Sequence, residues 1–248
     1  MLVTGGAGGI GRALLDTLTA RGWSVLATGR TPRPDFMHAS GRVRYVTADV
    51  TSADEIGAAV QASCELGPLV GCVANAGILA EDFSSVLDAS PAAWSRTLEV
   101  NVLGVLTTFQ AVSRVLARQG GGRMIATASV AGLRAEPNVP AYCASKAAVI
   151  ALVRSLALEL GPAHITVNAV APGPVATHAQ SRVTDSRAAV SAVETPAQRF
   201  DRHRTEGRPI PRVATPTDVA EAFAWLLSDA AAYVTGHVLT VDGGGVLA

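Results

Sequence analysis

A tyrosine and a lysine four positions apart are the clearest candidates for chemistry in this sequence. Tyr142 and Lys146 belong to the segment Tyr-Cys-Ala-Ser-Lys, which begins a long stretch of helical periodicity. This separation places the phenol and the ammonium on one helix face, one turn apart. An unperturbed tyrosine titrates near about 10, and a nearby cation favours the phenolate, which suits proton transfer. The same spacing also occurs in purely structural helices, so the pair alone does not establish a site.

Ser129 stands thirteen positions before Tyr142, at the end of an expected strand. In open parallel sheets, ligands bind outside the carboxyl ends of the strands. We therefore expect Ser129 to lie near the reacting end of a bound dinucleotide, on the edge of the sheet that also holds the glycine-rich turn.

That glycine-rich turn reads Thr-Gly-Gly-Ala-Gly-Gly-Ile-Gly from Thr4 to Gly11, between the first expected strand and the first expected helix. In this context a glycine pattern indicates a dinucleotide site. The missing side chains permit a tight turn and let the backbone approach a pyrophosphate at the positive end of a helix. A flexible loop without function is the alternative. Two spacings fit the run: Gly6, Gly8 and Gly11, or Gly5, Gly9 and Gly11.

The end of the second expected strand bears on which dinucleotide binds. An acidic residue about 20 positions beyond the glycine turn would bind the ribose 2′-hydroxyl of NAD. Here the strand is followed by Arg30, with Arg33 close behind, and no carboxylate is present in this stretch. A guanidinium pairs well with a phosphate, which a carboxylate would repel. The pattern favours NADP(H) over NAD(H), with an ordinary surface arginine as the alternative.

The elements that must position these residues alternate along the chain, which predicts an α/β fold of repeated βα units around a parallel sheet. Seven strands are expected, at Met1 to Thr4, Ser24 to Gly29, Val43 to Ala48, Leu69 to Asn75, Arg123 to Ser129, Ile165 to Val170 and Val238 to Val241. Helices are expected at Ile10 to Arg21, Ser52 to Glu65, Pro91 to Gln119, Ala141 to Leu160 and Thr215 to Leu227. Ser90 and Thr215, each followed by proline, are expected to cap their helices through a hydroxyl group.

We expect a single domain over residues 1–248, because no linker, repeat or low-complexity tract divides the chain. The segment from Pro174 to Arg212 departs from regular patterning, since it is polar and rich in arginine and serine. Long insertions between a strand and a helix often form lids or binding loops. We therefore expect a substrate-binding loop over residues 174–212, and a surface excursion without function is the alternative.

The composition describes a compact chain whose partner is a small molecule. Hydrophobic residues make up 49%, charged residues 16%, and the formal net charge is +0, so no global field draws the protein to nucleic acid or to an anionic membrane. Charged residues interrupt the longest apolar stretches, and no secretory signal opens the chain, so we expect a cytoplasmic enzyme that does not cross a membrane. Three cysteines without metal-ligand spacing predict buried free thiols and no metal site.

Taken together, these motifs resemble the short-chain dehydrogenase/reductase family, whose common form is about as long as this chain of 248 residues, and the likeness runs from Thr4 to about Gly244. The resemblance selects the glycine spacing of Thr4, Gly5, Gly9 and Gly11, with Ile10 inside it. The other cofactor motifs of the family correspond to Asp49 and Val50, to Asn75, Ala76 and Gly77, and to Pro172, Gly173, Val175 and Thr177. Its catalytic tetrad corresponds to Asn101, Ser129, Tyr142 and Lys146.

The resemblance implies a Rossmann fold with a doubly wound, seven-stranded parallel sheet, and a homodimer or homotetramer. It implies an oxidoreductase that moves a hydride between a nicotinamide dinucleotide and a carbonyl or alcohol carbon. Ser129 would hold the substrate oxygen and Tyr142 would transfer its proton. Lys146 would bind the nicotinamide ribose and lower the pKa of the tyrosine, and Asn101 would position a relay water.

The sequence departs from the family pattern in three places. Only Met1, Leu2 and Val3 precede Thr4, which is fewer residues than usual, so we expect either a weakened sheet centre or a shortened start. Ala74 and Ala128 replace an asparagine and a serine that are frequent in the family. The tetrad itself is complete.

The substrate is left open by the sequence. A ketoreductase of the 3-oxoacyl type fits, and the residues expected near the pocket lie at Ala80 to Phe83, Ala131 to Val139 and Pro174 to Arg212. The acidic residues there, Glu81, Asp82 and Glu136, either meet a polyol or face water. The alternative function is a cofactor-binding sensor or scaffold without turnover, since a fold alone does not fix a function. An epimerase or dehydratase is disfavoured, because no substrate domain follows the core.

Overall fold

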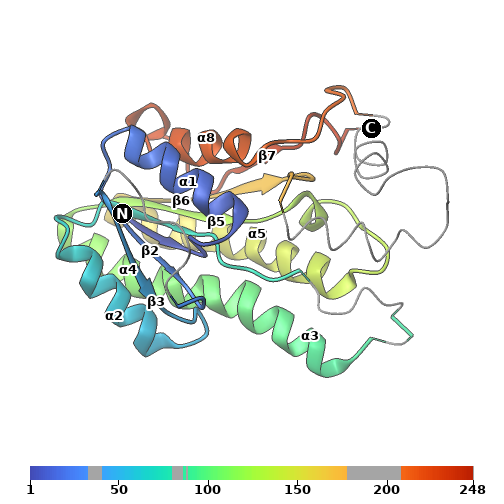
Figure 1. The fold of residues 1–248 in the computed structure, drawn as a ribbon, viewed down its shortest axis with the longest axis horizontal. Helices are drawn as coiled ribbons and strands as arrows, with labels where there is room; N and C mark the ends of the chain where they lie inside the picture. Colours follow the sequence, from blue (N-terminus) through green and yellow to red (C-terminus); the bar gives the residue numbers. More distant parts are fainter. Residues whose placement is uncertain (33–40, 80–85, 88, 178–207, 248) are drawn as a thin grey trace.

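The computed structural model describes residues 1–32, 41–79, 86–87, 89–177 and 208–247, and Figure 1 shows their arrangement. The strands are β1 (Leu2–Thr4), β2 (Val25–Gly29), β3 (Val43–Thr47), β4 (Gly71–Ala74), β5 (Gly122–Thr127), β6 (Ile165–Pro172) and β7 (Val238–Val241). The helices are α1 (Gly9–Ala20), α2 (Ala53–Cys64), α3 (Pro91–Leu98), α4 (Gly104–Gln119), α5 (Pro140–Leu160) and α8 (Pro216–Leu226).

All seven strands join one parallel sheet in the order β3-β2-β1-β4-β5-β6-β7. The chain therefore winds outward in both directions from β1 and β4, which confirms the predicted doubly wound Rossmann fold. β1 is only three residues long, but it pairs on both sides, and all its residues are buried. The predicted strands are all present, and their ends differ from the prediction by a few residues at most.

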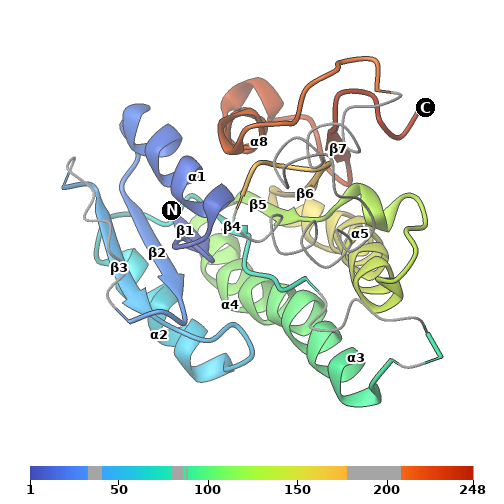
Figure 2. The same ribbon diagram turned by 45° about the vertical axis from the view of Figure 1, so that its right-hand side comes forward.

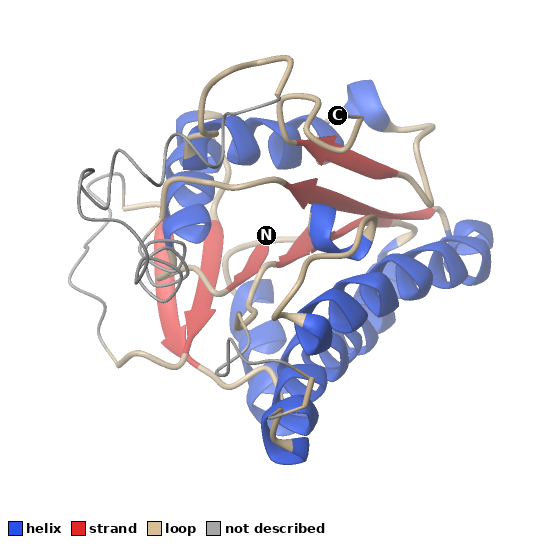
Figure 3. Cartoon of the chain, turned by 90° about the vertical axis from the view of Figure 1, so that its right-hand side faces the viewer, coloured by secondary structure: helices blue, strands red, loops and turns tan. Residues whose placement is uncertain are grey.

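Helices cover both faces of the sheet, as Figures 2 and 3 show, and the strands direct their side chains alternately into two hydrophobic cores. On one face, Leu2, Leu26 and Met124 pack under α2, α4 and α5, and on the other, Val3 and Ile125 pack under α1 and α8. Strand side chains point to opposite faces in turn, so a strand covered on both faces must be apolar at every position. This is why the sequence shows continuous apolar runs instead of polar alternation.

The predicted helix Pro91 to Gln119 is interrupted. A π-helical turn at Glu99–Leu103 separates α3 from α4, and Asn101 lies within it, fully buried. Such a turn inserts one residue into the helical repeat and is frequent at functional sites. The predicted cap at Ser90 is wrong, because its side chain forms no capping hydrogen bond. Thr215 caps α8 as predicted, in a reciprocal capping box with Asp218.

The cysteines are free, as predicted, but only Cys72 is fully buried, whereas Cys64 and Cys143 are half-buried. By length and composition alone, the stretches Pro91–Gln119 and Pro140–Ala163 could each cross a membrane. Both contain helices that pack against the sheet, and covering helices of this kind satisfy the same criterion.

Candidate active site

The glycine-rich turn brings the start of α1 against the end of β4. Gly5 has a φ of +68°, and a Cβ atom on it would lie 2.8 Å from the Cα of Ala76. At Gly11, a Cβ atom would collide with the carbonyl oxygen of Gly5. Both positions therefore require glycine, one for its left-handed backbone and one for the close approach of two backbone segments.

Thr4 and Asn75 join this turn to the neighbouring strand ends. The Thr4 hydroxyl accepts hydrogen bonds from the backbone N–H groups of Asn75 and Ala76, both at 3.1 Å. The Asn75 amide donates to the carbonyl of Gly5 at 3.2 Å and accepts from the Thr127 hydroxyl at 3.1 Å. Three strand ends, those of β1, β4 and β5, are thus linked by side chains at the edge where ligands bind in such sheets.

A cleft of about 440 Å³ lies over this edge. The residues predicted to hold the cofactor that line it are Gly5, Gly9, Ile10, Gly11, Arg30, Asp49, Val50, Asn75, Ala76, Gly77 and Thr177. The structure thus brings together residues from five separate segments that the sequence motifs named.

Asp49 lies at one end of the cleft with its carboxylate held in place. Its Oδ1 accepts hydrogen bonds from the backbone N–H and the hydroxyl of Thr51, at 2.9 and 2.8 Å. Burial acts to raise the pKa of Asp49, but these bonds and the charges of Arg96 and Arg30 outweigh it, so the pKa lies below its ordinary value. Arg96 Nη2 is 3.7 Å from the carboxylate.

Arg30 is exposed at the same end of the cleft, where its side chain forms no ion pair within the described ranges. Its charge nevertheless reaches Asp49, whose pKa it lowers. Arg33, the second arginine of the sequence prediction, lies outside the described residues.

A second pocket of about 200 Å³ continues from the cleft, with which it shares Ile10, Asn75, Gly77, Ile78 and Thr177. Its other predicted lining residues are Ser129, Tyr142, Lys146, Pro172, Gly173 and Val175. The proposed proton-transfer residues and the cofactor motif between Pro172 and Thr177 therefore share one small pocket at the end of the cleft.

Ser129 follows β5 and begins a short 3₁₀ turn, Val130–Gly132, where its hydroxyl accepts a hydrogen bond from the Ala131 N–H at 3.2 Å. Tyr142 lies opposite, in the first turn of α5. Burial is the main effect that raises the pKa of Tyr142 to about 12, opposed by a hydrogen bond with Ser129 and reinforced by the charge of Glu136. The phenol is therefore protonated at neutral pH in the protein alone.

Lys146 lies one turn further along α5, almost fully buried, and its ammonium donates to the carbonyl of Thr127 at 2.8 Å. The ammonium is 5.6 Å from the centre of the Tyr142 ring. Burial lowers the pKa of Lys146 to about 8. The expectation that Lys146 lowers the pKa of Tyr142 is not met in the protein alone, because the cost of burying a phenolate exceeds the attraction of a cation at that distance.

Asn101 does not line either pocket, because the π-helical turn points it inward. Its carboxamide accepts from the Ile78 N–H at 2.8 Å and donates to the Ile78 carbonyl at 2.9 Å and to the Ser145 hydroxyl at 3.0 Å. Ser145 in turn donates to the carbonyl of Tyr142 at 2.7 Å. Asn101 thus connects the wall of the pocket at Ile78 with the first turn of α5.

Comparison with known proteins places this arrangement in a family. Residues 5–245 match the family model described as enoyl-(acyl carrier protein) reductase. The chain is 37% identical to 2-(S)-hydroxypropyl-CoM dehydrogenase 3 of Xanthobacter autotrophicus, over 98% of this chain and 94% of that protein. It is 36% identical to the 3-oxoacyl-[acyl-carrier-protein] reductase MabA of Mycobacterium tuberculosis, over 98% and 91% of the two chains. The chain belongs to the short-chain dehydrogenase/reductase family.

The solved structures agree with this assignment. An NAD⁺-bound xylitol dehydrogenase superposes with a TM-score of 0.89 and 31% identity, over 98% of this chain and 97% of that one. Short-chain dehydrogenases/reductases are oxidoreductases that bind nicotinamide cofactors and act on alcohol and carbonyl groups. This chain is therefore an enzyme of that class, as the motifs predicted.

The cleft of this short-chain dehydrogenase/reductase fits such a cofactor. The glycine turn leaves the start of α1 open, since a Cβ atom on Gly8 would meet only the Gly5 carbonyl oxygen, at 3.4 Å. The space there lies at the N-terminal end of a helix, which attracts phosphate groups. A Cβ atom on Gly9, by contrast, would lie 2.7 Å from the Thr177 side chain, so Thr177 packs directly against the glycine turn.

The sequence reasoning missed three residues that contribute polar groups to the site. Thr127 and Ser145 contribute hydroxyl groups, and Ile78 contributes its backbone. Thr127 donates a hydrogen bond to Asn75 through its hydroxyl and accepts one from Lys146 through its carbonyl. Ser145 links Asn101 to the backbone of Tyr142. Only the position of Ser145, directly before Lys146, was a usable signal. The contacts of the other two depend on how distant segments meet.

Proposed function

We propose that this enzyme is an NADP(H)-preferring reductase or dehydrogenase in which Tyr142 transfers the proton. The observation that supports it best is the small pocket at the end of the glycine-lined cleft, where Tyr142 shares a hydrogen bond with Ser129 and lies one helical turn from Lys146. A phenol and a cation meet there beside the space that suits a nicotinamide.

The division of labour that we propose is the one that the family resemblance implies. A bound dinucleotide would supply the hydride for reduction of a carbonyl carbon, or accept one from an alcohol carbon in oxidation. The Ser129 hydroxyl holds the substrate oxygen, and Tyr142 gives that oxygen a proton in reduction or removes it in oxidation. Lys146 binds the nicotinamide ribose and keeps a positive charge near the phenol. Asn101 fixes the backbone at Ile78, which lines both pockets.

Replacement of Tyr142 by phenylalanine tests this assignment. Because the phenol acts mainly in the transition state, we expect Tyr142→Phe to keep its affinity for NADPH and to lose most turnover, at least about 100-fold. Fluorescence titration of NADPH and initial rates with a panel of ketones would measure both properties. Unchanged turnover would contradict the role of Tyr142, and tight NADPH binding by the wild type with no oxidation by any carbonyl would favour the scaffold alternative.

Arg30 supports the preference for NADP(H), since its guanidinium lies exposed at the end of the cleft and is free to bind a 2′-phosphate. We expect the wild type to bind NADPH more tightly than NADH, and Arg30→Ala to lose that preference by about tenfold or more. Paired fluorescence titrations measure this, and Arg118→Ala, exposed in the last turn of α4, is the matched control. A preference for NADH, or one unchanged in Arg30→Ala, would show that Arg30 is an ordinary surface charge.

Within the family, the substrate is a small carbonyl compound or secondary alcohol, and the likeness to MabA supports a reductase of the 3-oxoacyl type as one candidate. The single domain over residues 1–248, the substrate-binding loop over residues 174–212, the dimer or tetramer and the cytoplasmic location stay predictions. Residues 178–207 of that loop lie outside the described residues, as do Glu81 and Asp82.

A further inference from the structure

The pocket around Tyr142 contains a carboxylate that the proton transfer does not use. Glu136 lies between the 3₁₀ turn and α5, half-buried, and lines the pocket together with Tyr142 and Lys146. Among the described lining residues it is the one acidic side chain. Most of the wall around it is apolar, formed by Ile78, Leu79, Val130, Val139, Pro174 and Val175.

The Glu136 carboxylate accepts no hydrogen bond within the part of the chain that the structure describes, although its charge acts on the nearby Arg208 and works to raise the pKa of that guanidinium. Its backbone is held in place, since the Cys143 thiol is 3.8 Å from the carbonyl oxygen of Glu136. Its side chain forms no hydrogen bond or ion pair there, yet its charge reaches the phenol and contributes to the raised pKa of Tyr142. A half-buried acceptor without a donor, next to the reacting groups, is available to a ligand.

The surrounding charges restrict what that ligand can be. Arg208 packs against the pocket wall at Gly173 and donates to the Asp242 carbonyl at 3.0 Å. Arg134 donates to the Gly245 carbonyl at 2.7 Å, and its charge lies within electrostatic reach of Arg208. With Lys146 inside the pocket, these cations disfavour an ammonium group on the substrate.

An anionic group next to Glu136 is also disfavoured, because like charges at close range repel. The other nearby carboxylate, Asp242, is already engaged, since it accepts from the N–H groups of Gly244 at 3.0 Å and Val246 at 2.7 Å. The substrate group that suits the Glu136 carboxylate is therefore a neutral hydrogen-bond donor.

We propose that Glu136 selects substrates that have a second hydroxyl group close to the reacting carbon, by accepting a hydrogen bond from it. The substrate class is then hydroxyketones and the corresponding diols. This inference rests on the proposed function, because it assumes that the reacting oxygen lies between Ser129 and Tyr142. Glu136 is a specificity-determining residue in this scheme and takes no part in the proton transfer.

The test compares matched pairs of ketones with NADPH: 2-hydroxycyclohexanone against cyclohexanone, and 3-hydroxy-2-butanone against 2-butanone. We expect wild-type kcat/KM to favour the hydroxyketone in each pair, and Glu136→Leu to reduce that ratio about tenfold or more, as for a lost hydrogen bond to a charged group. The loss should come mainly from a higher KM for the hydroxyketone. Each ratio divides kcat/KM for the hydroxyketone by kcat/KM for the plain ketone. Any effect of Glu136 on Tyr142 applies to both ketones and therefore cancels.

Two control variants complete the experiment. Glu136→Gln keeps a neutral acceptor and should retain part of the ratio, whereas Glu159→Gln, exposed near the end of α5, should leave it unchanged. A ratio that is the same in the wild type and in Glu136→Leu would overturn the inference, while loss of turnover in Tyr142→Phe would still support the proposed function. Absence of turnover with either member of both pairs would contradict the proposed function and the inference with it.

Discussion

Burial sets the protonation states of the two residues at the centre of the site. It raises the pKa of Tyr142 to about 12 and lowers that of Lys146 to about 8, so near neutral pH the phenol keeps its proton and most of the ammonium keeps its charge. A protonated phenol beside a cation is ready to donate to a carbonyl oxygen. At the scale of single residues, the protein alone is therefore prepared for reduction, and oxidation first requires the phenol to lose its proton.

The two directions of the reaction should consequently differ in their dependence on pH. Well below a pKa of about 12, the protonated fraction of Tyr142 is constant while its phenolate fraction rises tenfold for each pH unit. We expect kcat/KM for ketone reduction to be flat between about pH 5.5 and about pH 7, below the pKa of Lys146, and kcat/KM for alcohol oxidation to rise over the same range. Initial rates in both directions measure this. Oxidation that is independent of pH would be inconsistent with a raised pKa.

The candidate reacting residues could be named from the sequence, and the structure brings them into one pocket, but their environment could not be predicted. Tyr142, Lys146 and Ser129 stand at fixed spacings, whereas the pKa of the phenol depends on how densely distant segments surround it. The inward orientation of Asn101 was equally hidden, because it depends on the π-helical turn and on contacts with Ile78 and Ser145.

At the scale of elements, apolar runs predicted the strands well because the central strands are buried on both faces. The ends and irregularities of helices were less predictable. The break at Glu99–Leu103 contains neither glycine nor proline, so no residue in it signals a departure from the helix. Ser90 and Thr215 both precede a proline, but only Thr215 has Asp218 three residues later to complete the capping box. A capping residue is thus better predicted from a hydroxyl residue together with an acidic residue three positions later than from the hydroxyl residue alone.

Ser90 and Thr215 allow a matched test of helix capping. Thr215 accepts from the Asp218 N–H at 3.2 Å, so we expect Thr215→Ala to lower the free energy of unfolding by about 1 kcal/mol. Ser90→Ala removes no such bond and should change it by less than about 0.5 kcal/mol. Urea denaturation of both variants measures the difference. Equal losses would contradict the capping geometry.

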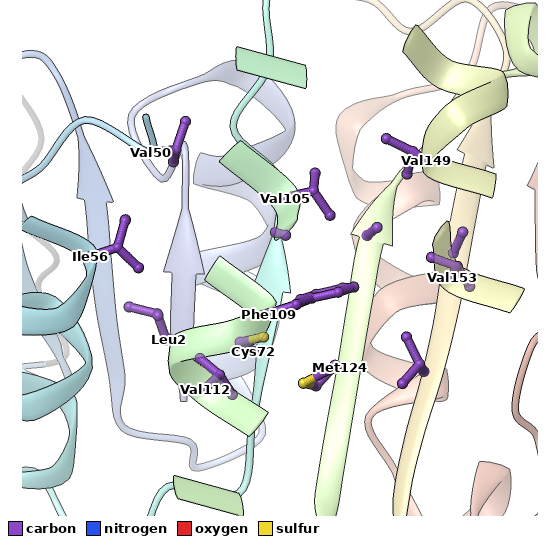
Figure 4. Close-up of a cluster of buried hydrophobic side chains, with 14 of the residues drawn as sticks. Leu2, Val50, Ile56, Cys72, Val105, Phe109, Val112, Met124, Val149 and Val153 are labelled. Carbon is purple, nitrogen blue, oxygen red and sulfur yellow. The ribbon is translucent and has the colours of Figure 1, made fainter. Parts of the chain in front are cut away.

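At the scale of the whole molecule, the sheet is shared by two hydrophobic cores. Figure 4 shows Phe109 of α4 in one of them, among Leu2, Cys72 and Met124. Phe223 of α8 occupies the other core, and both rings are almost completely buried. Because each strand contributes to both cores, loss of either core should disrupt the same sheet.

A chain of this kind should unfold as one cooperative unit. We expect Phe109→Leu and Phe223→Leu each to lower the free energy of unfolding by about 1–3 kcal/mol, through the cavities they leave. In both variants, urea transitions followed by tryptophan fluorescence and by circular dichroism should coincide. Two separate transitions in either variant would contradict the prediction of a single domain.

The bonds that link Thr4, Asn75, Gly5 and Thr127 join protein groups to one another and need no ligand to complete them. We therefore expect the dinucleotide to meet ordered walls, so that little conformational entropy is lost on association. In a calorimeter, the heat-capacity change should then reflect the surface that the ligand and these walls bury, without the larger contribution that accompanies coupled folding.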